Sequence, residues 1–383
     1  MVALFEQDLR LFTTREILTY PAHEIPPYTP LSPDPQITAQ RLASLYRLKE
    51  SKEPLLFVTS IEALMRRVMP EAALTLASEL ILSGEDCDVV TLRNNLITMG
   101  YEQVALVQNI GDFSIRGGIV DVYPPPFTLE GGRTIEGPVR LDFFGDTVDS
   151  LRIFDPLTQR STAEISEAVF LPVTDILIKH YDTAVKARTA HAFHRKAIDL
   201  DWDRVKNAAL VEQITNGQRF AGMEFFLPLF YTGLPNPSST VLSFFPKDAT
   251  LLIVEPEAVG QNIELVYERI LANYKAAQDS ATPALLPTEL FLDIEETRGQ
   301  IACFNQLLCT DLSKDTDCTV AVATQNHQLL KQEIALQRRQ RGILMPLAEQ
   351  ITTWQNKGDL VILCCRSARH MRNLGELLSK HHL

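Results

Sequence analysis

The sequence predicts an α/β protein with more than one domain, and three features indicate this class. Its 383 residues exceed the roughly 100 to 200 residues of one typical domain. Apolar runs of strand length at 55–58 and 250–254 each precede a segment of helical character, as in a parallel sheet covered by helices. Between them, residues 111–161 alternate polar and apolar side chains around glycine turns, which favours a β-rich segment.

The elements along the chain follow from periodicity and capping signals. Apolar residues at helical spacing from Gln36 to Leu48 predict a helix, and the wholly apolar run Leu55–Val58 predicts a buried strand. Thr59 and Glu62 form a capping box that would begin a helix continuing to Met69. Further predicted elements are an extended proline-rich loop at 1–35, helices at 87–99, 256–277, 325–341 and 367–380, a helical or poorly ordered segment at 180–216, strands at 250–254, 319–323 and 360–364, and a linker at 281–287.

The stretch from Gly111 to Ser161 carries the clearest pattern in the chain. Gly117 and Gly118 interrupt an alternating strand and predict a tight turn between two strands. In the next predicted strand, period two gives an inward set of Val139, Leu141 and Phe143 and an outward set of Arg140, Asp142 and Phe144. An aromatic residue beside an arginine on an outward face is typical of an interface anchor. The alternative is a half-buried Phe144 under a solvated Arg140.

Every cation between Gly100 and Phe170 is an arginine, and none is a lysine. The planar guanidinium fork suits paired carboxylates at an interface, which favours a role in recognition. The same window contains many acidic residues, so internal pairing of the arginines is the alternative. The arginines of this window are Arg116, Arg133, Arg140, Arg152 and Arg160.

Charge and cysteine usage exclude several classes of protein. The net charge of −12 argues against a large nonspecific nucleic-acid surface. The six cysteines show no repeated C-x-x-C spacing, which favours a reducing cytoplasm and no zinc site. No apolar run reaches the ~20 residues of a membrane span, and the start lacks a signal-peptide pattern. We therefore expect a cytoplasmic protein without a membrane partner.

The chemistry expected of an enzyme does not appear in the sequence. No G-x-x-x-x-G-K-[ST] loop is present to hold nucleotide phosphates. Residues 293–296 faintly imitate an acidic strand end, but a linker or helix start is the favoured interpretation. His191 and His194 could face one way on a helix, but zinc would need a further close ligand. We expect no enzymatic activity, no cofactor and no metal on this chain alone.

Arg116, residues 140–156 and residues 158–161 closely resemble the bacterial transcription-repair coupling factors, in the part shared with the B subunit of the excision nuclease, UvrB. Looser similarity extends over nearly the whole chain, at 32–33, 41–46, 221–226, 228–230 and 244–246. The resemblance implies an α/β architecture of three parts. These are an incomplete helicase-like parallel-sheet domain without a nucleotide site at 1–80 and 169–284, an inserted β-rich α+β UvrA-binding domain at 81–168, and a small α/β domain at 285–383.

The resemblance also implies a partner and a site. The family's principal contacts with the UvrA subunit correspond to Arg116, Arg140 and Phe144, which the outward pattern also selects in part. In full-length members, RNA polymerase and duplex DNA bind through regions outside this sequence, where the ATP-dependent translocase motor also lies. The chain is therefore expected to begin part way into its first domain and to be a DNA-repair module that docks UvrA without a motor.

Two other interpretations remain open at this point. The first is a fragment of a DNA-binding helicase subunit similar to the excision nuclease B subunit, although the tyrosine-rich DNA hairpin of that subunit has no counterpart between Tyr20 and Leu55. The second is an inert truncation that folds poorly because its first sheet is incomplete. An incomplete sheet would leave strand edges or apolar surface exposed near 55–58 and 250–254.

Overall fold

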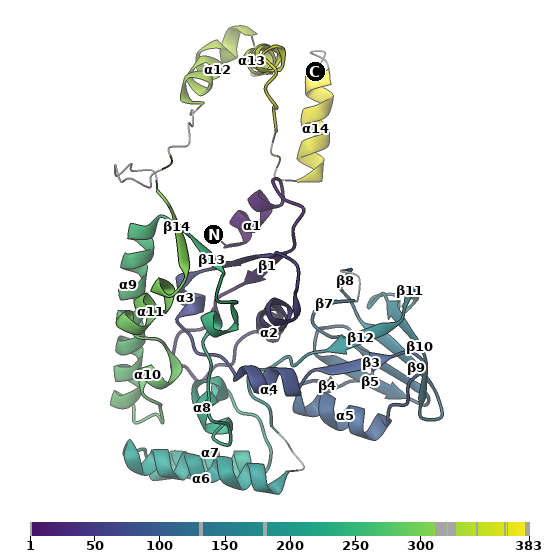
Figure 1. Ribbon diagram of the computed structural model, residues 1–383, viewed down its shortest axis with the longest axis vertical. Coiled ribbons are helices and arrows are strands. Elements are labelled where there is room, and N and C mark those ends of the chain that lie inside the picture. The colour runs from purple at the N-terminus through teal and green to yellow at the C-terminus, as the bar shows by residue number, and fades with distance from the viewer. Residues whose placement is uncertain are drawn as a thin grey trace. The chain divides into compact units, whose positions relative to one another are not determined.

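The computed structural model of the protein describes residues 2–129, 133–178, 182–310, 320, 327–341, 344–363, 365 and 367–379. The chain forms two compact units, Met1–Asp311 and Leu312–Leu383. Helices and strands are mixed along the larger unit, as an α/β protein requires (Figure 1).

The larger unit opens with a parallel pair of strands connected through a helix. Its first elements are α1 (Val2–Leu9), β1 (Ile17–Tyr20), α2 (Pro35–Glu50) and β2 (Leu56–Thr59), with β1 parallel to β2. Asp34 caps α2, because its side chain accepts a hydrogen bond from the Gln36 amide at 2.7 Å. Leu42 and Leu45 of α2 are fully buried in the core below the strands. The extended loop predicted for residues 1–35 is therefore wrong at α1 and β1, whereas residues 21–34 form neither helix nor strand.

The helix predicted from Thr59 to Met69 is much shorter than expected. Two short helices stand there, α3 (Ile61–Leu64) and α4 (Glu71–Leu76). The cap of α3 is Ser60, whose hydroxyl accepts from the backbone of Ala63. Arg66 and Val68 leave the helix because they form β-bridges with Phe291 and Ser239, which lie far along the sequence. Tertiary pairing overrides the local helical signal here.

The β-rich segment forms a six-stranded sheet with two smaller strand pairs. The order of the large sheet is β11-β10-β9-β6-β5-β4, and the smaller pairs are β12-β3 and β7-β8. The strands and the one helix of this segment are β3 (Glu79–Leu82), α5 (Val89–Thr98), β4 (Glu102–Gln103), β5 (Asp112–Arg116), β6 (Ile119–Val122), β7 (Phe127–Thr128), β8 (Thr134–Ile135), β9 (Val139–Phe144), β10 (Thr147–Phe154), β11 (Ser161–Ile165) and β12 (Glu167–Phe170).

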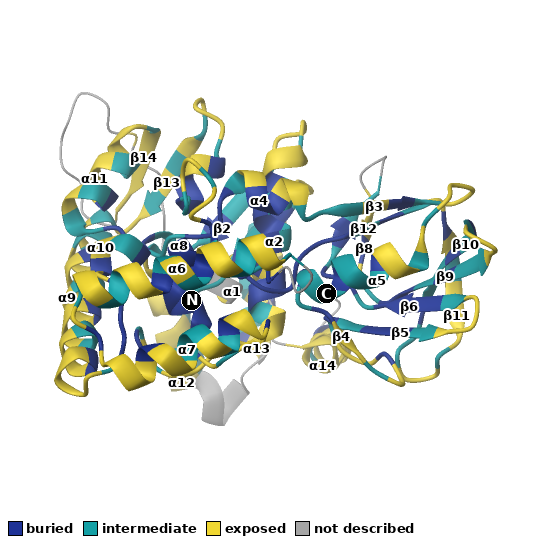
Figure 2. Ribbon diagram, turned by 90° about the horizontal axis from the view of Figure 1, so that it is seen from below, coloured by how far each residue is buried: buried dark blue, intermediate teal, exposed yellow. Residues whose placement is uncertain are grey.

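One face of this sheet forms the core of the β-rich segment. Val139 and Leu141 of β9 are fully buried there, and Phe143 packs against the same cluster. Leu92 and Leu96 of α5 belong to that cluster, so α5 covers this inner face. Figure 2 shows buried residues along these strands and exposed residues at the hairpin tips. The inward set predicted from period two is thus confirmed.

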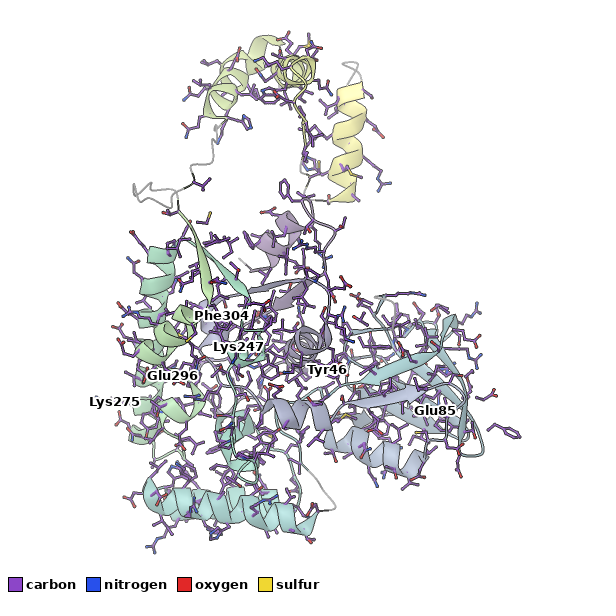
Figure 3. The ribbon with its side chains drawn as sticks, viewed as in Figure 1. Tyr46, Glu85, Lys247, Lys275, Glu296 and Phe304 are labelled. Atoms are coloured by element: carbon purple, nitrogen blue, oxygen red, sulfur yellow. The ribbon has the colours of Figure 1, made fainter. Side chains whose placement is uncertain are left out.

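The chain then returns to the rest of the larger unit. Its further elements are α6 (Thr183–Asp199), α7 (Arg204–Thr215), the 3-10 helices η1 (Met223–Phe226) and η2 (Val241–Phe244), α8 (Leu227–Phe230), β13 (Thr250–Val254), α9 (Pro256–Asp279), α10 (Pro287–Leu290), α11 (Ile294–Ala302) and β14 (Asn305–Cys309). Strand β14 pairs in parallel with β13, and the Phe304 ring lies 6.2 Å from that of Phe245 (Figure 3). Leu252 and Leu307 of this two-stranded sheet are exposed, which agrees with the apolar surface expected near 250–254.

The predicted linker at 281–287 does not separate the two units. Leu285 is fully buried, and the Trp202 indole donates to the Ala284 carbonyl at 3.1 Å. Residues 285–309, which we assigned to the small domain, therefore pack in the larger unit, and the units divide at Asp311. The division of the larger unit into a helicase-like domain and an insert stays a prediction.

The smaller unit consists of helices in its described part. They are α12 (Gln328–Arg341), α13 (Leu344–Asn356) and α14 (Ala368–Ser379). The helices predicted at 325–341 and 367–380 are confirmed, and α13 is an addition. The predicted strand at 360–364 is wrong for residues 360–363, which form no strand, and that at 319–323 lies outside the described residues apart from Val320.

A buried charged cluster lies where the chain returns from the β-rich segment to the parallel strands. His23 Nε2 lies 3.7 Å from Asp175 Oδ2, and their side chains are 2% and 7% exposed. The Arg41 guanidinium stacks over the Tyr20 ring at 4.1 Å. Burial, together with the nearby charges of Arg41 and Arg66, lowers the pKa of His23 to about 3. The fold therefore holds this imidazole neutral.

Stability should consequently depend on pH. In the unfolded chain the His23 imidazole has a pKa of about 6.5, so it binds a proton below that pH, whereas in the folded protein it stays neutral. The free energy of unfolding should therefore fall as pH drops below 6.5. We expect a loss of about 2 kcal/mol between pH 7.5 and pH 5, measured by urea denaturation. His23→Gln should flatten this slope, and His194→Gln, an exposed control, should not. An unchanged slope in His23→Gln would contradict the assignment.

The packing of the inner face of the large sheet leads to a second prediction about stability. Leu141→Ala should lower the free energy of unfolding by about 2 to 5 kcal/mol, because it opens a cavity among fully buried side chains. Val90→Ala is the matched control, since Val90 of α5 is exposed and should change stability by less than about 0.5 kcal/mol. Equal denaturation midpoints for the two variants would show that Leu141 is not a core residue.

Candidate protein-docking surface

Two glycine turns shape one end of the large sheet. Gly117 joins β5 to β6 and Gly145 joins β9 to β10, with φ of 59° and 66° at the first central position of each two-residue turn. Positive φ at that position suits the twist of a hairpin and is accessible to glycine at little cost. The Phe143 amide donates to the Gly118 carbonyl at 2.7 Å. Both turns therefore lie side by side at the same end of the sheet.

Strand register places two rows of side chains on the outer face, opposite the core. Residues directly across an antiparallel pair share a face, so each row runs across neighbouring strands. One row is Arg116, Ile119, Asp142 and Ser150, and the next is Ser114, Asp121, Arg140 and Arg152. Phe144 continues the outward alternation of β9 at the turn end. The outer face thus brings together all three residues predicted for the site.

The three predicted residues differ in exposure. Phe144 is 83% exposed, which removes the alternative of a half-buried ring. The Arg116 side chain is 49% exposed, whereas that of Arg140 is only 16% exposed. Phe144 and Arg116 therefore present their side chains to solvent, and Arg140 lies deeper in the face.

A buried carboxylate that sequence analysis missed organises the two arginines. Asp121 of β6 has no exposed surface, and its Oδ1 accepts from Arg140 Nε at 2.6 Å. Its Oδ2 accepts from Arg140 Nη2 at 3.0 Å and from Arg116 Nη2 at 2.6 Å. Hydrogen bonding to Asp121 raises the pKa of Arg140 above its ordinary value, although partial burial opposes this. The alternative of internal pairing is thus correct for Arg140 and partly so for Arg116.

Arg140 is also held by the last residue of β10 and by the loop that follows this strand. Its guanidinium lies 4.7 Å from the Phe154 ring centroid, and Nη1 lies 3.4 Å from the Gln159 carbonyl oxygen. Stacking on an aromatic ring and bonds from both edges leave the arginine little rotational freedom. Arg140 therefore has a fixed orientation on the face that also carries the more exposed Arg116 and Phe144.

A second ion pair flanks this group on the same face. Arg152 pairs with Asp142, donating to Oδ2 from Nη2 and from Nε, the latter at 3.1 Å. The Ser150 hydroxyl donates to the same oxygen at 3.1 Å. Opposite charges thus alternate across the strands, so the outer face is not a uniformly basic surface.

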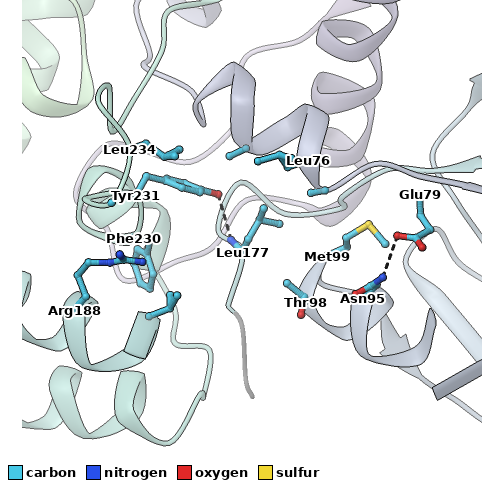
Figure 4. A pocket seen from close by; sticks show the side chains of 14 residues that line it. Leu76, Glu79, Asn95, Thr98, Met99, Leu177, Arg188, Phe230, Tyr231 and Leu234 are labelled. Atoms are coloured by element: carbon cyan, nitrogen blue, oxygen red, sulfur yellow. Dashed lines mark hydrogen bonds between the residues drawn. The ribbon is translucent and has the colours of Figure 1, made fainter. Parts of the chain in front are cut away.

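A cavity of about 310 Å³ lies where the β-rich segment meets the rest of the larger unit. Figure 4 shows Tyr231 and Leu177 on one side of it and Asn95 and Glu79 on the other. The Leu177 amide donates to the Tyr231 hydroxyl at 3.3 Å, and the Asn95 amide group donates to Glu79 at 3.1 Å. Its polar groups are thus already partly paired, and its walls come from both parts of the unit.

Other sites considered from the sequence take structural roles. Asp293 caps α11 by accepting from the Glu296 amide at 2.7 Å, so the acidic run is a helix start. His191 and His194 lie exposed on α6. Within the described ranges, no group of three or more metal-binding side chains gathers. Among those same residues, no helix has the length and apolar character to cross a membrane.

Known proteins match this chain along most of its length. A family model described as the UvrB interaction domain matches residues 81–175. A transcription-repair-coupling factor of Myxococcus xanthus is 28% identical over 365 residues, which cover 94% of this chain and 30% of that protein. That of Escherichia coli (strain K12) is 27% identical over 384 residues, 97% of this chain and 30% of that protein. That of Staphylococcus haemolyticus (strain JCSC1435) is 31% identical over 248 residues, 63% and 20% respectively.

The outer face with Arg116, Asp121, Arg140 and Phe144 falls within the segment that the family model matches. The chain spans about 30% of the length of the first two relatives, so those matches concern a part of each protein. Over nearly its whole length, this chain is thus similar to the transcription-repair coupling factors of bacteria, and it contains a UvrB interaction domain.

Proposed function

We propose that this chain is a DNA-repair docking module that binds the UvrA subunit of the excision nuclease. The observation that carries the proposal is the solvent-exposed Phe144 on the same face as two arginines held by one buried carboxylate. Exposed aromatic residues and oriented arginines are the side chains that most often dominate protein interfaces. Similarity to transcription-repair coupling factors and the UvrB interaction domain support UvrA as the partner.

The module acts by binding and has no motor of its own. The sequence contains no phosphate-binding loop, which nucleotide hydrolysis on a helicase-like fold requires. Contacts with RNA polymerase and duplex DNA, and ATP-dependent translocation, belong in this proposal to other parts of the full-length coupling factors.

Phe144→Ala and Arg116→Ala should each weaken UvrA binding roughly thirtyfold, because truncating a central aromatic or arginine anchor commonly costs ~2 kcal/mol. The Phe144 ring projects from the sheet, so the melting temperature of Phe144→Ala should stay within about 2 °C of the parent. Arg116→Ala removes one donor from buried Asp121, so its melting temperature should fall, and its affinity is measured below that temperature, on the folded protein. Val90→Ala is the matched control, since Val90 is an exposed apolar residue on α5, which covers the opposite face. Affinity is measured by surface plasmon resonance or calorimetry with purified UvrA. Parent-like affinity in both site variants would rule out this surface.

The rival function, a DNA-binding subunit like the excision nuclease B subunit, makes a different prediction. With a net charge of −12, we expect binding to duplex DNA to be weak and to vanish as salt is raised, because few phosphates are neutralised. Fluorescence anisotropy from 50 to about 200 mM salt measures this. Tight binding that persists at about 150 mM salt would favour the rival.

A further inference from the structure

One carboxylate accepts hydrogen bonds from two guanidinium groups on the outer face. Arg116 and Arg140 both donate to Asp121, which is fully buried beneath them. Two positive charges against one negative charge leave the group with a net charge of +1. A buried carboxylate in this position has no access to water, so its arginines must stay in place to compensate it.

The arginines keep hydrogen-bond donors for a further acceptor. Each guanidinium carries five N–H donors. Within the part of the chain that the structure describes, the Arg116 side chain makes one hydrogen bond, through Nη2, and nearly half of this side chain is exposed. Arg140 uses Nε and Nη2 on Asp121, and its Nη1 has one long contact of 3.4 Å. The free donors of Arg116 and the exposed ring of Phe144 stand at the turn end of one face.

We propose that Asp121 is a positioning residue that holds Arg116 and Arg140 as a receptor for one carboxylate side chain of UvrA, with Phe144 as the adjoining apolar contact. The inference rests on the proposed function and adds the chemistry of the partner. An oriented guanidinium donates two parallel N–H···O bonds to a carboxylate, and a pre-oriented one loses less side-chain entropy on binding. A carboxylate also matches the net charge of +1 left on the group.

The surroundings disfavour a polyanion such as nucleic acid at this place. Asp142 stands one row from Asp121 on the same face, and Glu164 is paired across from Arg152. The whole chain carries a net charge of −12. A run of phosphates laid across the face would approach both acids. A single carboxylate at Arg116, on β5, would lie two strands from Asp142, which is already paired with Arg152.

The test replaces Asp121 by its uncharged isostere. Asp121→Asn removes the charge that orients both arginines, so UvrA affinity should fall at least tenfold. Glu164→Gln is the matched control, because it removes an exposed carboxylate from the same face on the edge strand β11, across from Arg152 and away from Arg116 and Arg140. It should change affinity less than threefold. Equal losses in the two variants, or parent-like affinity of a folded Asp121→Asn, would overturn the positioning role.

A second measurement separates this inference from the proposed function. In 15N NMR of the chain alone, the Arg140 Nε–H resonance should be protected from exchange in the parent and exposed in Asp121→Asn. If the parent fails to bind UvrA, both the proposed docking function and the proposed binding of a UvrA carboxylate are wrong. The NMR result still decides whether Asp121 positions Arg140. An unprotected resonance in the parent would contradict the positioning.

Arg116→Lys provides a second test if Asp121→Asn does not fold. Lysine keeps the charge of Arg116 but lacks the planar fork, and this half-exposed position should tolerate it. We expect UvrA affinity to fall about tenfold, with an unchanged melting temperature. Parent-like binding by Arg116→Lys would show that no carboxylate is held by the fork. Acidic residues on the UvrA surface are also changed to amides one at a time and combined with Arg116→Lys. For the acid that contacts Arg116, the amide should weaken binding to the parent but should not weaken binding to Arg116→Lys any further. If every UvrA acid weakened binding to the parent and to Arg116→Lys equally, the proposal would be contradicted.

Discussion

The arrangement of side chains on the outer face of the large sheet depends on the ion pairs that compensate the buried charge of Asp121. A carboxylate without water contact is strongly unfavourable unless donors surround it, and here three N–H groups from two arginines supply them. This requirement fixes the two guanidinium groups as firmly as packing fixes the core on the other side. Strand β6 thus contributes to both stability and the proposed recognition, because Val120 faces the core and Asp121 faces the arginines.

Local pattern sufficed to predict the two faces of β9, but it left open whether Phe144 is exposed or half-buried. Side chains alternate strictly along a strand, so the sequence alone separates Leu141 from Arg140. It could not reveal the partner of Arg140, because that depends on the cross-strand register between β6 and β9. One signal was available, since Asp121 is a charged residue between Val120 and Val122 in an otherwise apolar strand. Such a residue usually requires a paired cation.

Elements shaped by distant contacts were predicted poorly. The helix expected to reach Met69 ends early, because Arg66 and Val68 form isolated β-bridges with Phe291 and Ser239. The expected linker near Leu285 is instead core, and the parallel pairing of β13 with β14 moves the unit boundary to residue 311. Chain segments that are far apart in sequence decide these features, and local propensity carries no information about them.

The two-residue turns at Gly117 and Gly145 constrain the length of the chain as well as its composition. Because neighbouring side chains of a strand point to opposite faces, a slip of one position in β9 would send Arg140 and Phe144 into the core and bring Leu141 to solvent. A single inserted or deleted residue in either turn therefore threatens folding and recognition at once, whereas substitutions on the outer face affect recognition first. Homologous chains that keep this surface should accordingly conserve the spacing between Arg116 and Phe144 more strictly than the residues between them.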